Sequence, residues 1–418
     1  MVSDETFKTL TARADLTESA FAFTYISKDT FDSLCQQCPY LWTLVASYVG
    51  PPLDLNGASV GDDHDALVYS LSTHCTELGA LSLRKWCMTD TALVTLSSLT
   101  YLRELDLSGC SNITSGGVRS LLASLNGKLK KLTLTGSCID TMLLRCIGDS
   151  CPKLTDLKLL VKDLGTSPQL IFLSLVYMIF KCSLLEIVDF GRELPSIGEL
   201  VLLTLSQACH GLISLAVAGA TYSGLRTLLT ACPLLQSLNL IKMSPFLDPS
   251  LAFEDTPCPS LTSITLHSEY ITDSQLCGLL KHCPNLQGLS LVCPLMSDET
   301  LLVLSQYCPK LKLIGIVCSS QVTSSAPLTG FAYLEHIDIE AELTEPTLAA
   351  FAVSCKCLRD ASFRGCTGLS CEDVLRFIGS TPNLRKLEVG GCWSVEEGEA
   401  LMRRVNAVYP RVTFGLAV

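Results

Sequence analysis

Leucines recur along almost the whole chain in the pattern Leu-x-x-Leu-x-Leu, in which the intervening positions vary. In several copies a Cys-Pro pair stands just before the first leucine, as in the stretch 151–159. The first leucine of each copy marks about fourteen repeats, which begin at Leu41, Leu78, Leu102, Leu129, Leu154, Leu185, Leu212, Leu235, Leu261, Leu286, Leu311, Leu334, Leu358 and Leu384. From Leu78 onward these markers lie 23 to 31 residues apart. A period of this size predicts stacked structural units.

Each repeat is predicted to hold a strand, a turn and a helix. In the repeat that starts at Leu102, Leu105 and Leu107 fall on one side of a strand, because side chains alternate faces along it. A polar hinge at 108–112 then precedes apolar positions with helical spacing at 118–122.

The starts and ends of the helices also have local signals. Thr89-Asp90, Thr272-Asp273 and Ser297-Asp298 each precede an apolar periodic run, and these side chains can accept the first free N–H groups of a helix. The Cys-Pro pair ends a helix, because proline cannot continue its hydrogen bonds.

One such repeat cannot bury its own apolar face, but stacked copies can. The chain has 418 residues, of which 48% are hydrophobic, so it can hold a long core shared between neighbours. We therefore predict one elongated α/β horseshoe, a solenoid with a parallel sheet on the concave side and helices on the convex side. Several separate globular domains are not expected.

Two stretches are most informative about the class of repeat, 107–114 (LSGCSNIT) and 389–395 (VGGCWSV). With the Cys-Pro-x-Leu phrases, they make residues 30–405 resemble the cysteine-containing leucine-rich repeats of F-box/LRR proteins. The resemblance implies a protein-binding function, with substrate recognition for an SCF-type (cullin) ubiquitin ligase as one form of it. That form needs an F-box ahead of the repeats. The region before Leu41 is already repeat-like, so we expect no F-box there.

The ends and two interruptions complete the predicted organisation. We expect an N-terminal cap over 1–25, repeats over 26–405 and a C-terminal cap over 406–418, with irregular stretches at 47–70 and 161–195. Within the second stretch, residues 170–180 are apolar on every side, yet too few to cross a bilayer. They form either a convex helix covered by its neighbours and the 161–168 loop, or a helix that presents an apolar patch to a partner protein.

The net charge and the cysteines indicate which partners and which cellular compartment to expect. The net charge is −11 without any basic run, which argues against nucleic acid and against insertion at an anionic membrane. About half of the 22 cysteines occupy repeat positions, where a small apolar thiol packs beneath a turn. No signal peptide is visible. We therefore expect a reducing intracellular compartment, the cytoplasm first, with the nucleus or a cytoskeletal structure as alternatives.

No catalytic motif is found. The chain has no phosphate-binding loop, no zinc-binding helix motif and no nucleophile turn. Cys35 and Cys38 have the spacing of a metal or redox pair, but no second pair is near, and Cys38 is a repeat cysteine. The six histidines stand at unrelated repeat positions. We expect no enzyme activity, no cofactor and no metal.

Function in such an array usually resides on the concave sheet. Its outward side chains are small or apolar in the central repeats and become charged in the last three, where His336, Asp360 and Lys386 also point outward. The candidate partner-binding residues are Ser214, Ala216, Ser237, Asn239, Ser263, Thr265, His267, Ser290, Val292, Gly315, Val317, Asp338, Glu340, Arg364 and Glu388. The small residues either relieve crowding on a curved face or let a segment of a partner protein dock, with Asp338, Glu340 and Glu388 meeting basic residues.

Three functions fit this surface. The first is a non-catalytic scaffold or adaptor, either free or a subunit of a larger assembly. The second is the ubiquitin-ligase role that the resemblance implies. The third is a regulator or inhibitor that caps an enzyme. All three require a protein partner and differ in its identity.

Overall fold

The computed structural model describes residues 17–23, 27–48, 64–136, 138–160, 168–192, 198–243, 257–294, 296–322, 330–366, 368–391, 393 and 395–417. By their internal contacts the residues form two compact units. The N-terminal unit comprises 1–196 with 207–212, and the C-terminal unit comprises 197–206 with 213–418.

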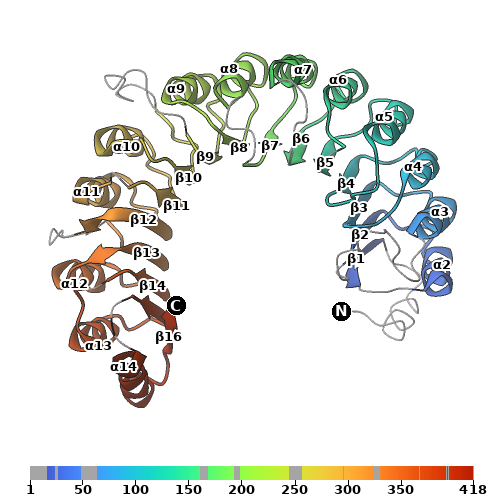
Figure 1. Ribbon diagram of the computed structural model, residues 1–418. Coiled ribbons are helices and arrows are strands. Elements are labelled where there is room, and N and C mark those ends of the chain that lie inside the picture. Colours follow the sequence, from blue (N-terminus) through green and yellow to red (C-terminus); the bar gives the residue numbers. More distant parts are fainter. Residues whose placement is uncertain are drawn as a thin grey trace. The chain divides into compact units, whose positions relative to one another are not determined.

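The N-terminal unit alternates strands and helices. Its strands are β1 (Glu18–Phe23), β2 (Thr43–Tyr48), β3 (Ala80–Arg84), β4 (Glu104–Leu107), β5 (Lys131–Thr135), β6 (Asp156–Leu160) and β7 (Ile187–Asp189). Its helices are α2 (Lys28–Gln37), α3 (His64–His74), α4 (Asp90–Leu96), α5 (Ser115–Ser124), α6 (Thr141–Ser150) and α7 (Pro168–Lys181). Each strand pairs in parallel with the next one along the chain, and the helices cover one face of the sheet (Figure 1).

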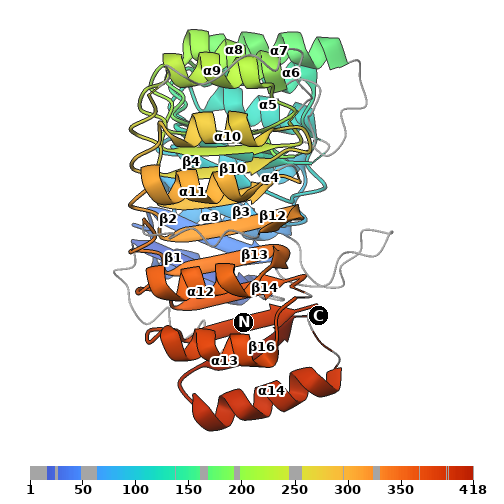
Figure 2. The same ribbon diagram turned by 90° about the vertical axis from the view of Figure 1, so that its left-hand side faces the viewer.

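The C-terminal unit repeats this arrangement. Its strands are β8 (Ser214–Ala218), β9 (Ser237–Ile241), β10 (Ser263–His267), β11 (Gly288–Val292), β12 (Leu313–Val322), β13 (His336–Leu343), β14 (Asp360–Arg364), β15 (Lys386–Gly390) and β16 (Thr413–Ala417). Its helices are α8 (Gly198–Ala208, most of which belongs here), α9 (Tyr222–Ala231), α10 (Asp273–Leu280), α11 (Asp298–Tyr307), α12 (Glu345–Ser354), α13 (Cys371–Ser380) and α14 (Val395–Val408). Figure 2 shows helices α10 to α14 stacked in chain order in front of the strands.

The predicted repeat is confirmed at the level of single residues. Each of the fourteen marker leucines is buried and stands two residues ahead of one of the strands β2 to β15. The backbone explains this regular entry into the sheet. The N–H groups of Thr155 and Asp156 both donate to the carbonyl of Lys130 in the preceding repeat, at 2.9 and 3.0 Å. The same pair of bonds recurs from repeat to repeat, so the buried leucine sets where each strand begins.

The predicted caps and irregular stretches stay predictions. Residues 1–16 of the N-terminal cap lie outside the described part of the chain, as do 49–63 and 161–167 of the irregular stretches. Strand β1 precedes the first marker leucine, and β16 follows the last repeat and pairs with β15.

The predicted helix starts are confirmed, and the structure adds a link between them. Thr89, Thr272 and Ser297 are the N-cap residues of α4, α10 and α11. The aspartate that follows Thr89 also reaches the next repeat: Asp90 accepts the backbone N–H of Thr114, the N-cap of α5, at 2.8 Å. Charge-assisted bonds to backbone N–H groups are stronger than neutral ones. Consecutive helix starts are therefore tied together.

The repeat cysteines pack as predicted. The thiols of Cys110, Cys182 and Cys308 donate to backbone carbonyls of the preceding repeat, those of Leu83 at 3.0 Å, Cys151 at 3.5 Å and Leu280 at 3.6 Å. Burial raises the pKa of each of these thiols to about 12. Because the thiolate is the nucleophile, these groups are unreactive at neutral pH.

A short pulse of iodoacetamide at pH 8 is expected to modify Cys357 well before Cys110, Cys182 or Cys308. Cys357 is exposed, whereas the other three are buried and stay protonated. Peptide mapping by mass spectrometry reads the order of labelling, and the protein unfolded in guanidinium is the control in which all sites react. Labelling of Cys110 at the rate of Cys357 in the folded protein would contradict the assignment.

The apolar stretch 170–180 forms most of α7, and it has two different sides. Ile171, Leu175 and Met178 are buried, whereas Leu170 and Leu173 are 57% and 61% exposed. The helix is therefore covered on one side and presents apolar side chains on the other. The interpretation of this stretch as a helix covered by its neighbours accounts for the buried side of α7 but not for the exposed side. Among the described residues, no helix has the length and apolar character needed to span a membrane.

Candidate binding surface on the concave sheet of the C-terminal unit

The parallel register aligns outward side chains of the C-terminal unit in three rows that cross the strands. The first row is Ser214, Ser237, Ser263, Gly288, Leu313, His336, Asp360 and Lys386. The second row is Ala216, Asn239, Thr265, Ser290, Gly315, Asp338, Ser362 and Glu388. The third row contains His267, Val292, Val317, Glu340 and Arg364. The residues between the rows are buried.

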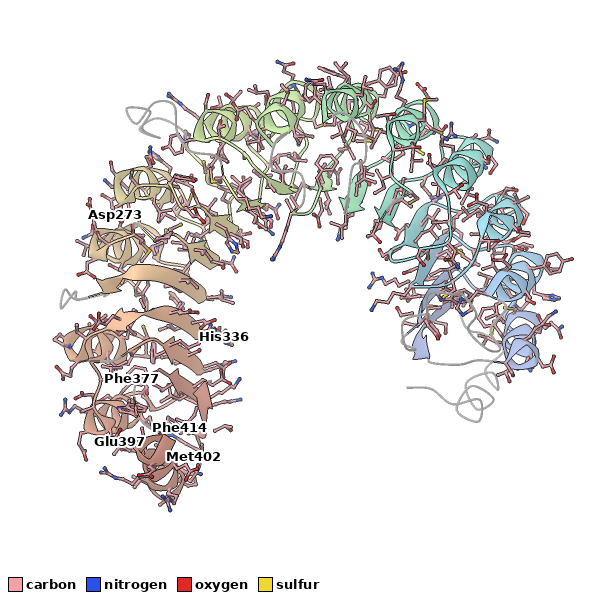
Figure 3. The ribbon with its side chains drawn as sticks, viewed as in Figure 1. Asp273, His336, Phe377, Glu397, Met402 and Phe414 are labelled. Atoms are coloured by element: carbon pink, nitrogen blue, oxygen red, sulfur yellow. The ribbon has the colours of Figure 1, made fainter. Side chains whose placement is uncertain are left out.

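All fifteen candidate residues lie on these rows, and none of them is buried. Figure 3 shows His336 on this inner face, while Asp273 lies on the outer side with the helices. The rows change character along the chain, as the sequence indicated. They are small or uncharged on β8 to β12 and, except for Ser362, charged on β13 to β15. The role of the fifteen residues in binding stays a prediction.

A hollow of about 510 Å³ lies where the rows change from small to charged side chains. It is lined by Ser290, Leu313, Ile314, Gly315, His336, Ile337, Asp338, Asp360, Ala361, Ser362, Arg364, Lys386 and Glu388. Gly315 leaves room on its floor: a Cβ atom there would meet Ser290 Oγ no closer than 3.7 Å. Five of the fifteen candidates therefore line one space, and the other ten lie outside it.

Ion pairs between neighbouring strands organise the charged end. Arg364 Nη2 lies 2.8 Å from both carboxylate oxygens of Asp338, and Nη1 lies 3.6 Å from Glu340. His336 Nδ1 lies 2.8 Å from Asp360. These contacts leave the side chains half-exposed, so each contributes little to stability.

The charges do not balance. The fourth carboxylate, Glu388, contacts Lys386 Nζ at 2.7 Å and raises its pKa. The hydrogen bond from Asp338 likewise raises the pKa of Arg364. Among the outward side chains of β13 to β15, four carboxylates thus face two permanent cations and one histidine, so these rows carry surplus negative charge even when the histidine is protonated.

The N-terminal unit has a smaller hollow with a different charge pattern. Its volume is about 210 Å³, and its charged lining residues are Arg84, Glu104, Asp106 and Lys131. Arg84 pairs with Asp106 at 2.7 Å, and Lys131 with Glu104 at 3.0 Å. Burial disfavours the charged form of Asp106, but hydrogen bonds from Ser108 and Arg84 outweigh it and lower its pKa. These charges are matched one to one.

Sequence reasoning identified part of the lining. Alternation predicts that His336, Asp360 and Lys386 face outward, but the candidate set contains none of these three lining residues and does not contain Ser362. The signal was present, because Ser362 stands between the core residues Ala361 and Phe363 and therefore alternates outward. Within the described ranges, no three His, Cys, Asp or Glu side chains gather as a metal site.

The comparisons with known proteins concern the fold. No family model and no curated protein match the sequence. The crystal structure of the Rad7 and Elc1 complex in yeast is similar, with a TM-score of 0.53 and 15% identity over 98% of this chain and 83% of that one. The crystal structure of the TLR13–ssRNA13 complex matches with a TM-score of 0.45 and 15% identity, over 85% of this chain and 51% of that one. From its period, its parallel strands and the first of these similarities, the chain has an α/β leucine-rich-repeat solenoid fold.

Proposed function

We propose that the chain is a non-catalytic scaffold or adaptor that binds a partner protein on the concave sheet of its C-terminal unit. The observation that carries this proposal is the 510 Å³ hollow, which joins a floor of small side chains to a charged end. A flat, fully packed sheet would leave no space for the side chains of a partner to enter. An open floor lets partner side chains be desolvated, which is where interfaces gain most of their affinity.

The charged end is proposed to set the register of the partner. Asp338, Glu340 and Glu388 supply carboxylates to basic residues, in keeping with the surplus of negative charge there. Charge complementarity of this kind steers the encounter and selects one orientation. The N-terminal hollow is a weaker candidate because its charges already satisfy one another.

A ubiquitin-ligase role is the second candidate, and it rests on the resemblance to F-box/LRR repeats. The packing of Cys110, Cys182 and Cys308 beneath the turns supports assignment to the cysteine-containing class. The similar Rad7 fold was solved in a complex, with Elc1. The third candidate, a regulator that caps an enzyme, uses the same surface and differs in its partner.

Gentle affinity purification of the tagged chain, followed by cross-linking mass spectrometry, tests the proposal. We expect a partner cross-linked near β11 to β15, for example at Lys312 or Lys386, which lie at this end of the sheet. A cullin and its adaptor in near-stoichiometric amounts would favour the ligase role. An inactive enzyme would favour the regulator. Cross-links confined to the helices would contradict binding at the concave sheet.

A further inference from the structure

The outer side of α7 carries an apolar stripe. Leu170, Leu173, Tyr177 and Phe180 follow one another at i, i+3, i+7 and i+10, which places them along one face of the helix. Leu170, Leu173 and Phe180 are 57%, 61% and 50% exposed. Met142 on the neighbouring helix α6 is also exposed, at 56%.

The helix that carries the stripe is held firmly. Its other face is buried through Ile171, Leu175 and Met178. Helix α6 approaches so closely that a Cβ atom on Gly148 would lie 3.1 Å from the Cα atom of Met178. The exposed side chains are therefore presented on a fixed support, so a partner that docks there orders few additional groups.

Two cations flank the stripe. Arg145 of α6 and Lys181 of α7 lie over the ring of Tyr177, at 5.1 and 5.6 Å from its centroid. The Tyr177 hydroxyl donates to Asp149 at 2.5 Å, which raises the pKa of Tyr177. One carboxylate thus lies beside two cations on this face. In the described part of the chain, neither cation has a carboxylate within ion-pairing distance. The cation–π contacts hold both cations beside the apolar stripe.

We propose that this face of α6 and α7 is a second docking surface, and that its occupant is an acidic amphipathic helix of a partner protein. Apolar residues of that helix would cover Leu170, Leu173 and Phe180, while its carboxylates meet Arg145 and Lys181. This surface lies on the helices and not on the sheet, so the inference goes beyond the proposed concave site. An adaptor with both surfaces joins two partners.

A displayed library of helical peptides tests the choice of occupant. Its members carry apolar residues at i, i+3, i+4 and i+7 and vary Asp, Glu, Gln, Lys and Arg at the flanking positions. The full chain is the bait, and the Leu173→Asp variant is the counter-bait. Peptides retained by the wild-type chain but lost by the variant are expected to be net acidic. Retained peptides that are neutral or basic, or an absence of Leu173-dependent peptides, would overturn the proposal.

Charge reversal provides the second measurement. The double variant Arg145→Glu with Lys181→Glu is expected to weaken the selected acidic peptides by at least about tenfold in fluorescence anisotropy at low salt. Unchanged affinity would contradict the assignment of the cations. Val353→Asp on α12 is the matched control for Leu173→Asp, because Val353 is 69% exposed on another helix. This variant should leave peptide affinity unaltered.

Two further checks keep the result interpretable. Circular dichroism establishes that the variants are folded, and Phe180→Ser replaces Leu173→Asp if that variant is not. Sedimentation of the wild-type chain tests self-association: a dimer that Leu173→Asp dissociates would overturn the acidic-partner assignment in favour of a second copy. Peptide binding is expected to persist in a Gly315→Arg variant, so failure of the concave site and failure of this one are distinguishable.

Discussion

Replacing Gly315 with arginine is expected to weaken partner binding at the concave sheet by more than about a hundredfold, the range of a central interface residue. The new side chain would fill the floor of the hollow and lie beside Asp338, its neighbour in register. It would therefore remove space and neutralise part of the negative end in one step. Affinity for the purified partner, measured by calorimetry, reads the effect.

The fold is expected to tolerate this change. A Cβ atom at Gly315 has ordinary contact distances of 3.7 Å or more, and the side chain continues toward solvent. Gly315→Ala is the size control and should bind almost normally. Thr133→Arg places the same charge in the hollow of the N-terminal unit and should leave binding unchanged. Undiminished binding by Gly315→Arg, in a folded protein, would reject the concave site.

Phe351→Ala is expected to lower the free energy of unfolding of the C-terminal unit by about 3–5 kcal/mol, the usual cost of removing a buried phenylalanine ring. Phe351 on α12 has no exposed surface, and its ring stacks on Phe331 at a centroid distance of 6.3 Å. The surrounding core relaxes only partly around such a cavity, so the loss includes a cavity term beside the lost transfer free energy. Urea unfolding measures the loss.

Val353→Ala on the same helix is the matched control. Val353 is largely exposed, so its truncation should change stability by less than about 0.5 kcal/mol. Hydrogen exchange locates the effect, and faster exchange in α12, β13 and β14 is expected. Equal destabilisation by the two variants would contradict a stabilising role for the buried Phe351 ring.

Much of the fold follows from local features of the chain. The marker leucines predicted where fourteen strands begin, because burial of one side chain per repeat fixes the entry of the chain into the sheet. Thr89, Thr272 and Ser297 predicted helix starts, because capping needs only residues that are close in sequence. Alternation along each strand placed all fifteen candidate residues on the outward-facing rows.

Side-chain contacts between repeats cannot be predicted from such local features. Arg364 meets Asp338, 26 residues away, and Thr114 meets Asp90, 24 residues away. Each contact depends on the register between two strands or two helices and on the rotamers of long side chains. The sequence shows only that such residues face the same side. Which of them pair, and which carboxylates are left in surplus, depends on the packed structure.

The concave sheet and the outer face of α7 also show which features depend on sequence alone and which depend on packing. The sequence by itself determined the repeat, the strand starts and the change from small to charged residues along the sheet, because these depend on spacing and polarity. Only the tertiary structure decided that five of the candidates share one hollow and that α7 exposes Leu170 and Leu173. Residues 170–180 are apolar on every side of α7, so polarity offers no contrast there. Packing against neighbouring elements, helix α6 among them, determines which of its side chains are buried.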